Sequence, residues 1–311
     1  MAPPPPARSL GAMKHLVLHA GAAKTGSTLV QKALNANREK LGAKGYAVLV
    51  RHDYETATGG AHARWRRRGA GIENVALGFA RLRDQLEHES LVLSHEDLFA
   101  TVQSFRRGPV YRSAGDVLRL AVKELRPERI TVLFYVRRQD RFVESAYLQT
   151  VRMGSTLTFE EFMEPVADEY LRWDVLVDQM RAALPDGADL RVKYFETIKT
   201  LGSRGFVRDF FAATGAGVPP TFSFNTESVN RGYSDVALQI ALLGNGLLEK
   251  QDTQELRHFL DAHFSNLTHP PPRLLTPERR AGLLATLAPS NEALHRGIGA
   301  DGTSPYLPGA S

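Results

Sequence analysis

The stretch HLVLHAGAAKTGSTLVQKAL, residues 15–34, decides the fold. It begins with an apolar run typical of a buried strand, continues through a turn with two glycines and a lysine, and ends with the spacing of an amphipathic helix. A turn between a strand and a helix N-terminus directs backbone N–H groups, and the positive end of the helix dipole, at one point. We therefore expect this turn to bind a phosphate, with Ser27 and Thr28 adding hydroxyl donors.

The position of the lysine separates this loop from that of the nucleotide triphosphatases. In their pattern, G-x-x-x-x-G-K-[ST], the lysine follows the second glycine. Here Gly21 and Gly26 have the same spacing, but Ser27 occupies the lysine position and Lys24 lies inside the loop. The loop keeps its ability to bind phosphate, and its lysine meets that phosphate from the other side.

Strands and helices alternate along the first two thirds of the chain. Four apolar runs predict buried strands, at residues 16–19, 91–94, 130–136 and 190–195. This alternation predicts an α/β fold of three layers, with a mostly parallel central sheet between helices, as in P-loop proteins. After residue 200 the pattern is mainly helical. We expect a proline-rich lead-in without regular structure over residues 1–13 and a single domain over residues 14–311.

Two helix starts carry the pattern of a capping box, in which a Ser or Thr pairs with an acidic residue three positions later. Ser113 with Asp116 precedes one helical stretch, and Thr158 with Glu161 precedes another. Both pairs predict the N-terminus of a helix.

The composition is that of a globular protein with a sizeable core. Of the 311 residues 43% are hydrophobic and 23% are charged. The absence of cysteine excludes disulfides, thiolate metal sites and a cysteine nucleophile, and the net charge of +5 favours an anionic ligand. No apolar run approaches the roughly 20 residues of a membrane helix, and the first residues do not resemble a secretory signal. We expect a cytoplasmic protein.

Two elements of the sequence together resemble the sulfotransferases that use 3′-phosphoadenosine 5′-phosphosulfate (PAPS). In that family a K-[ST]-G-[ST]-T loop holds the 5′-phosphosulfate, and KTGST at residues 24–28 matches it position for position. The second family element is an arginine after a strand, with a serine eight residues later. Arg137 follows the apolar run at residues 130–136, and Ser145 stands eight residues further on. A guanidinium fork and a hydroxyl on the next helix suit the 3′-phosphate.

The resemblance implies a sulfotransferase of the bacterial carbohydrate or small-molecule type. It implies PAPS as donor, 3′,5′-ADP (PAP) as product and no metal, with Lys24 as the catalytic cation. Donor-binding residues implied by the loop are Lys24, Thr25, Gly26, Ser27 and Thr28. The pair Phe195–Glu196 would place Phe195 near the adenine. The late loop would supply Asn230, Arg231 and Gly232, although Asn-Arg-Gly also suits a simple turn.

A base that takes the proton of the acceptor hydroxyl has three candidates. Glu96 and its neighbour His95 follow the apolar run at residues 91–94, and His62 lies in a glycine-containing loop. The sequence ranks Glu96 first, where family enzymes acting on carbohydrates carry a glutamate. The acceptor would be a carbohydrate, a glycolipid or another small molecule, without nucleic acid as partner.

Two other functions stay open at this point. A P-loop kinase or nucleotide hydrolase would need a magnesium-binding Asp at a strand end, and Asp97 is the nearest candidate, three residues late. A non-catalytic polyanion-binding protein would use the basic run ARWRRRGAG, residues 63–71, which otherwise is a solvated loop or a contact to an anionic substrate. Neither function accounts for KTGST together with Arg137 and Ser145.

Overall fold

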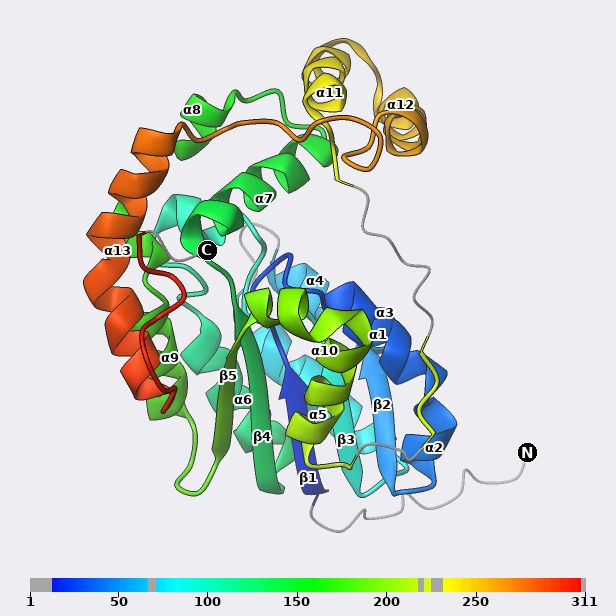
Figure 1. Ribbon diagram of the computed structural model, residues 1–311. Helices are drawn as coiled ribbons and strands as arrows, with labels where there is room; N and C mark the ends of the chain where they lie inside the picture. Colours follow the sequence, from blue (N-terminus) through cyan, green and yellow to red (C-terminus); the bar gives the residue numbers. More distant parts are fainter. Residues whose placement is uncertain (1–12, 67–70, 218–220, 225–231, 309–311) are drawn as a thin grey trace.

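A five-stranded parallel sheet forms the centre of the computed structural model, which describes residues 13–66, 71–217, 221–224 and 232–308 (Figure 1). The strand order is β2-β3-β1-β4-β5, and every neighbouring pair is parallel. The strands are β1 (Met13–His19), β2 (Tyr46–Val50), β3 (Ser90–Ser94), β4 (Pro127–Val136) and β5 (Asp189–Tyr194). The predicted fold class is confirmed, and all four predicted strands are present. β2 was not predicted.

Helices cover both faces of the sheet because successive strand residues point to opposite sides. On one face Val17 and Val92 pack with the apolar side of α1 (Ser27–Ala36) and α10 (Ile198–Thr214). On the other face Leu16 and Leu91 belong to the larger core. The helices that contribute to this second core include α5 (Glu73–Gln85), α6 (Ala114–Leu125) and α9 (Trp173–Ala183).

The topology opens a crevice at the carboxyl end of the sheet. After β1 the chain forms β2 and β3 on one side of β1, and it then crosses to form β4 and β5 on the other side. Ligands of open parallel sheets bind where the strand order reverses in this way. Helix α7 (Gln139–Arg152) follows β4 and lies above this end of the sheet (Figure 1).

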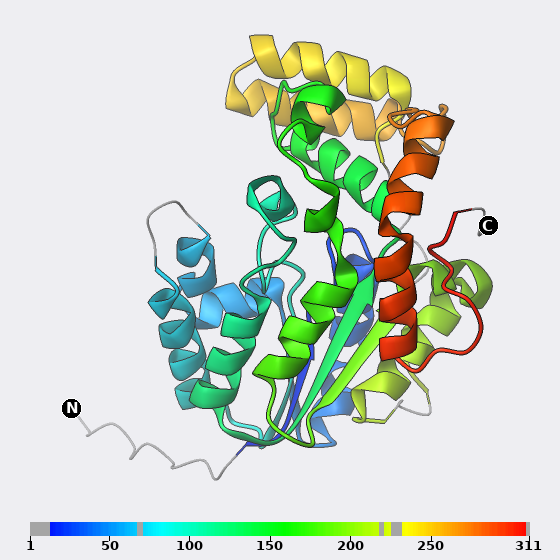
Figure 2. The same ribbon diagram turned by 90° about the vertical axis from the view of Figure 1, so that its left-hand side faces the viewer.

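The remaining helices are short elements around the sheet and a helical C-terminal part. They are α2 (Arg38–Gly42), α3 (Arg51–Ala57), α4 (Ala61–Trp65), α8 (Phe159–Met163), α11 (Asp235–Leu247), α12 (Lys250–His263) and α13 (Pro277–Gly297), with 3-10 turns Ser104–Arg107, Asp168–Leu171 and Phe195–Thr197. Helices α11 and α12 lie side by side beyond α7, and α13 runs along the side of the molecule next to α9 (Figure 2). Within the described ranges, no helix combines the length and the apolar character needed to cross a membrane.

Candidate active site

The backbone of the loop between β1 and α1 is fixed to β4 and to the segment that precedes α6. The N–H of Ala22 donates to the carbonyl oxygen of Tyr135 at 2.9 Å, and the N–H of Ala23 donates to the hydroxyl of Tyr111 at 2.8 Å. Lys24 and Gly26 both have left-handed backbones, with φ of 67° and 79°. A non-glycine residue in this region is uncommon, and such residues gather at functional sites. The surrounding structure therefore holds the loop in one conformation, and this conformation directs Lys24 outward.

Thr25 and Gly21 determine the inside of this loop. The Thr25 side chain is fully buried, and its hydroxyl donates to the carbonyl oxygen of Ala22 at 2.5 Å. A Cβ at Gly21 would lie only 2.6 Å from that hydroxyl oxygen, so a side chain there would displace it. Thr25 can therefore reach a ligand only through its backbone. Helix α1 begins directly afterwards, and its first N–H groups have no intrahelical acceptor.

Arg137 connects the second sequence element to the loop. It follows the last residue of β4, and its carbonyl oxygen accepts a hydrogen bond from the Trp173 indole at 2.8 Å. Its Nη1 donates to the Ser145 hydroxyl at 2.9 Å and to the carbonyl oxygen of Lys24 at 2.8 Å. The guanidinium also lies over the Phe195 ring, 5.5 Å from its centre. Two stretches more than one hundred residues apart thus meet at one guanidinium.

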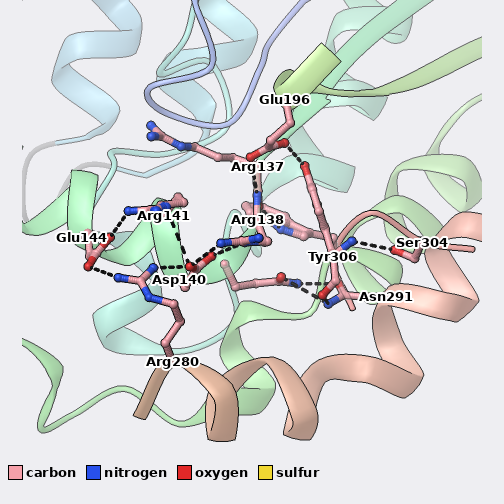
Figure 3. Close-up of polar contacts among 12 residues, drawn as sticks. Arg137, Arg138, Asp140, Arg141, Glu144, Glu196, Arg280, Asn291, Ser304 and Tyr306 are labelled. Atoms are coloured by element: carbon pink, nitrogen blue, oxygen red, sulfur yellow. Dashed lines mark hydrogen bonds and ion pairs between the residues drawn. The ribbon is translucent and has the colours of Figure 1, made fainter. Parts of the chain in front are cut away.

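The residue after Arg137 belongs to a separate structural network, shown in Figure 3. The N–H of Arg138 donates to Glu196 at 3.0 Å, and its side chain binds the carboxylate of Asp140 at 2.8 and 3.0 Å. Asp140 is fully buried and also binds Arg280 from α13. Glu196 accepts a further hydrogen bond, 2.6 Å long, from the hydroxyl of Tyr306. The C-terminal part of the chain therefore holds the start of α7, which carries Ser145.

A cleft of about 870 Å³ lies at the carboxyl end of the sheet, a volume suited to a nucleotide-sized ligand. The predicted donor-binding residues that line it are Lys24, Gly26, Ser27, Thr28, Arg137, Ser145, Phe195 and Gly232. Thr25 lies behind the loop. Asn230 and Arg231 lie outside the described residues, and the N–H of Gly232 donates to Asn266 at 2.8 Å.

Lys24 is the lysine among the cations that line this cleft. Its Nζ lies 3.5 Å from the amide oxygen of Gln149, which stands one turn after Ser145 on α7. Desolvation in the cleft lowers the pKa of Lys24, and the positive charges of Arg152 and Arg137 lower it further. An anionic ligand that reached Lys24 would offset both effects.

Glu96 is the one of the three predicted bases that lines the cleft. Its Oε1 lies 2.8 Å from Arg51 Nη1, and its Oε2 accepts from Gln31 at 2.7 Å. Desolvation opposes the charged form of Glu96, but hydrogen bonds from Arg51, from its own backbone and from Gln31 outweigh it. The pKa of this carboxyl is therefore lowered.

The two predicted histidine bases are misplaced for that role. His62 is fully buried, with Nδ1 2.9 Å from the Tyr54 hydroxyl and Nε2 2.8 Å from the carbonyl oxygen of Leu98, and burial lowers its pKa to about 3. His95 is also fully buried. Its Nε2 lies 3.3 Å from Glu55, and its Nδ1 accepts from the N–H of Asp97. Because their ring nitrogens are occupied inside the core, neither can meet an acceptor hydroxyl.

Comparisons with known proteins find similarity to solved structures. No family model matches the chain, and no curated protein sequence matches it. The chain is similar to the crystal structure of a sulfotransferase from Alicyclobacillus acidocaldarius, with 17% identity, a TM-score of 0.49 and coverage of 92% of this chain and 96% of that one. Similarity at this level does not assign an activity, so the function has to be argued from the cleft itself.

Several residues that line the cleft were not predicted from the sequence to bind the donor or the acceptor. Arg51, Asp97 and Gln149 line the cleft, as do Asn266 and other residues up to position 274. In the basic run Arg64 is exposed, whereas Arg66 lines the cleft and binds Glu55 at 2.7 Å. The next four residues of that run lie outside the described ranges. Among described side chains, no group of three or more His, Asp or Glu is placed to hold a metal ion.

Proposed function

We propose that this protein transfers the sulfuryl group of PAPS to an acceptor hydroxyl. The observation that carries the proposal is the pair of hydrogen bonds from Arg137 to Ser145 and to the carbonyl oxygen of Lys24. These bonds bring both sequence elements to one cleft. A ligand with an anionic group at each end of an adenosine fits this arrangement better than one with a single polyphosphate.

The donor would lie with its two phosphate-bearing ends on different elements. The 5′-phosphosulfate would bind at the start of α1, where free N–H groups and the helix dipole favour an anion. The 3′-phosphate would bind Arg137 and Ser145, since a guanidinium forms paired hydrogen bonds to phosphate oxygens. Phe195 would contact the adenine. The Arg137 guanidinium above the Phe195 ring holds that ring in position.

Lys24 would supply the electrostatic part of catalysis. During transfer the bond between sulfur and the bridging oxygen of the phosphosulfate breaks, and negative charge develops on that oxygen. An ammonium group held beside it stabilises this charge in the transition state. The remaining contribution of the protein is to hold donor and acceptor in line.

The acceptor would enter from the side of the cleft lined by Arg51, Glu96 and Asp97. Its oxygen forms the new bond to sulfur, and a carboxylate there takes the proton from its hydroxyl. Carboxylates and arginines suit the hydroxyl groups of a carbohydrate or glycolipid, or of a small polar molecule. Pro271 and Leu274 add an apolar wall.

Binding of the product PAP tests the proposal directly. A ligand of the folded state at about 100 times its dissociation constant stabilises by about 2.7 kcal/mol. We expect PAP to raise the melting temperature clearly without magnesium, and ATP with magnesium to raise it much less. Stabilisation by ATP with magnesium alone would instead support a nucleotide kinase or hydrolase.

Two substitutions separate the proposed roles of Lys24 and Arg137. Lys24→Ala should abolish release of labelled sulfonate from PAPS in a folded protein. Lys32→Ala, which changes an exposed lysine on the helix after the loop, should not. Arg137→Ala should weaken PAP binding by at least tenfold, because it removes the guanidinium fork. Unchanged turnover in the first variant, or unchanged PAP affinity in the second, would contradict the assignment.

A further inference from the structure

Two consecutive carboxylates, Glu96 and Asp97, line the acceptor side of the cleft directly after β3. Both bind the same guanidinium nitrogen, Arg51 Nη1, at 2.8 and 2.9 Å. A reaction that removes one proton needs one base, so the two side chains have different roles. Their environments distinguish them, and this assignment rests on the proposed sulfuryl transfer.

Each carboxylate oxygen of Glu96 accepts a hydrogen bond from a neighbouring side chain. Arg51 occupies one carboxylate oxygen, and Gln31 of α1 occupies the other at 2.7 Å. The same Gln31 amide also approaches the carbonyl oxygen of Ser94 at 3.3 Å. A proton on Glu96 would neutralise the carboxylate and weaken its ion pair with Arg51. Glu96 therefore links the end of β3 to α1 through Gln31 and to α3 through Arg51.

Asp97 keeps one carboxylate oxygen available. Its Oδ2 binds Arg51, and within the described part of the chain no hydrogen-bond donor reaches its Oδ1. Its backbone is fixed on both sides: the N–H donates to His95 at 3.2 Å, and the carbonyl oxygen accepts from Arg66 at 3.2 Å. The side chain is 18% exposed, so it is accessible from the cleft but largely shielded from bulk water.

The charged groups around Asp97 come from three elements. Arg51 and Glu55 belong to α3, Arg66 follows α4, and His95 and Glu96 precede Asp97 in its own segment. Desolvation raises the pKa of Asp97, Arg51 lowers it and the charge of Glu96 raises it again, with a raised pKa as the result. A base is most effective when its pKa lies nearer the working pH.

We propose that Asp97 is the general base for the acceptor and that Glu96 is a positioning residue that holds Arg51. The acceptor proton moves to Oδ1 of Asp97 while the acceptor oxygen bonds to sulfur. The bond from sulfur to the bridging oxygen of PAPS breaks, and its electron pair stays on PAP, beside Lys24. No oxidant, reductant or further reactant is required.

The isosteric variants Asp97→Asn and Glu96→Gln test this division. Because the acceptor is unidentified, the probe is water, and the readout is release of labelled sulfate from PAPS as a function of pH. We expect Asp97→Asn to lower the rate by about 10²- to 10⁴-fold and to remove the acidic limb of the pH profile. Glu96→Gln should retain that limb, whatever its effect on the rate. PAP affinity should change by less than threefold in Asp97→Asn.

Each other outcome has a defined meaning. Loss of the acidic limb in Glu96→Gln, with its retention in Asp97→Asn, would make Glu96 the base and overturn the proposal. Wild-type protein that binds PAP but releases no sulfate would also overturn it, because a general base in the cleft should take a proton from water as it attacks the sulfur. If Asp97→Asn does not fold, Asp97→Ser with added formate replaces it, and recovery of the rate by formate is the expected result. Failure of wild-type protein to bind PAP would refute the sulfuryl transfer itself.

Discussion

At the residue scale, the order of residues in the loop has a physical basis in two left-handed positions. Lys24 and Gly26 both have positive φ, and the buried Thr25 between them donates its hydroxyl back into the loop. This backbone turns Lys24 into the cleft ahead of the helix, whereas a lysine at position 27 would lie on the helix itself. The sequence pattern therefore predicted which segment supplies the lysine, but not the left-handed backbone that positions it.

Gly26→Ala should damage the loop because the position needs both a positive φ and free space. An added Cβ would lie 3.2 Å from Phe195 Cε2 and 3.4 Å from Phe206 Cε1, at a φ of 79°. We expect the free energy of unfolding to fall by about 1–2 kcal/mol, and PAP binding to weaken. Chemical denaturation and calorimetric titration measure the two effects.

Gly282→Ala is the matched control for that substitution. Gly282 is an exposed residue inside α13, and an added Cβ there meets nothing within 4 Å. Because alanine is the better helix former, we expect this variant to gain about 0.5–1 kcal/mol. Equal effects of the two substitutions would show that the conformation of Gly26 is not required.

The candidate site residues that the sequence pointed to are those within a local motif. Lys24, Ser27 and Thr28 lie in five consecutive residues, and Arg137 and Ser145 lie eight apart across a strand end. Arg51 and Asp97 come from separate elements and meet only through tertiary packing. No local spacing predicts such convergence. The burial of His62 and His95 was not predicted, because a histidine in a loop-like sequence carries no sign of being buried.

At the element scale, the three strands buried on both faces were predictable, as was the edge strand β5, whereas the opposite edge strand β2 was not predicted. β1, β3 and β4 carry continuous apolar runs that are almost fully buried from Leu16, Ser90 and Ile130 onward. β2 is paired on one side only, and three of its five residues are partly exposed. A short apolar run of this kind does not distinguish an edge strand from part of a helix.

The two predicted capping boxes had opposite outcomes. Thr158 and Glu161 form the reciprocal pair, with the Glu161 N–H donating to the Thr158 hydroxyl at 3.2 Å and the Thr158 N–H donating to the Glu161 carboxylate at 2.7 Å. Ser113 makes no side-chain cap, and Asp116 binds Arg119 at 2.6 Å instead. The pattern alone does not decide whether the side chains turn back or pair along the helix.

Helix α13 should owe part of its attachment to Arg280. This guanidinium binds the buried Asp140 and also Glu144, at 2.7 Å, both on α7. Without Arg280 the buried Asp140 keeps its bonds from Arg138, but part of the positive charge that compensates its carboxylate is lost. We expect Arg280→Met to lower the free energy of unfolding by about 2–3 kcal/mol and to weaken PAP binding, because α7 carries Ser145.

Its neighbour Arg279 provides the control for that experiment. Arg279 lies 3.6 Å from Glu160, and both side chains are at least half exposed. Exposed pairs of this type contribute about 0–1 kcal/mol. Arg279→Met should therefore change stability little in the same denaturation experiment. Similar losses in both variants would mean that the network in Figure 3 does not anchor α13 to α7.

At the scale of the whole molecule, four histidines whose pKa is lowered by burial make folding depend on pH. They are His15 and His19 in β1, His62 in α4 and His95 after β3, and each is at most 3% exposed. Burial lowers the pKa of His15 and of His19 to about 4 and that of His62 to about 3, and it also lowers the pKa of His95. His15, His19 and His62 therefore stay neutral in the folded protein near pH 5.5, where the unfolded chain binds protons on them.

The consequence is a loss of stability on mild acidification. Because the unfolded state binds more protons below its histidine pKa of about 6.5, the free energy of unfolding should fall as the pH falls from 6.5 towards 4, by up to about 1.4 kcal/mol per pH unit for each histidine. The lowered pKa of Glu55, about 2, acts mainly below pH 4.5, which is below the lowest pH of the measurement. Urea denaturation at pH 7.5, 6.5 and 5.5 measures the slope, and constant m-values check that the transition is unchanged.

His62→Gln should reduce the slope even though it lowers stability, since it removes one proton-binding site from the unfolded chain. A slope that His62→Gln leaves unchanged would mean that His62 is charged in the folded protein, which its contacts with Tyr54 and Leu98 inside the core argue against.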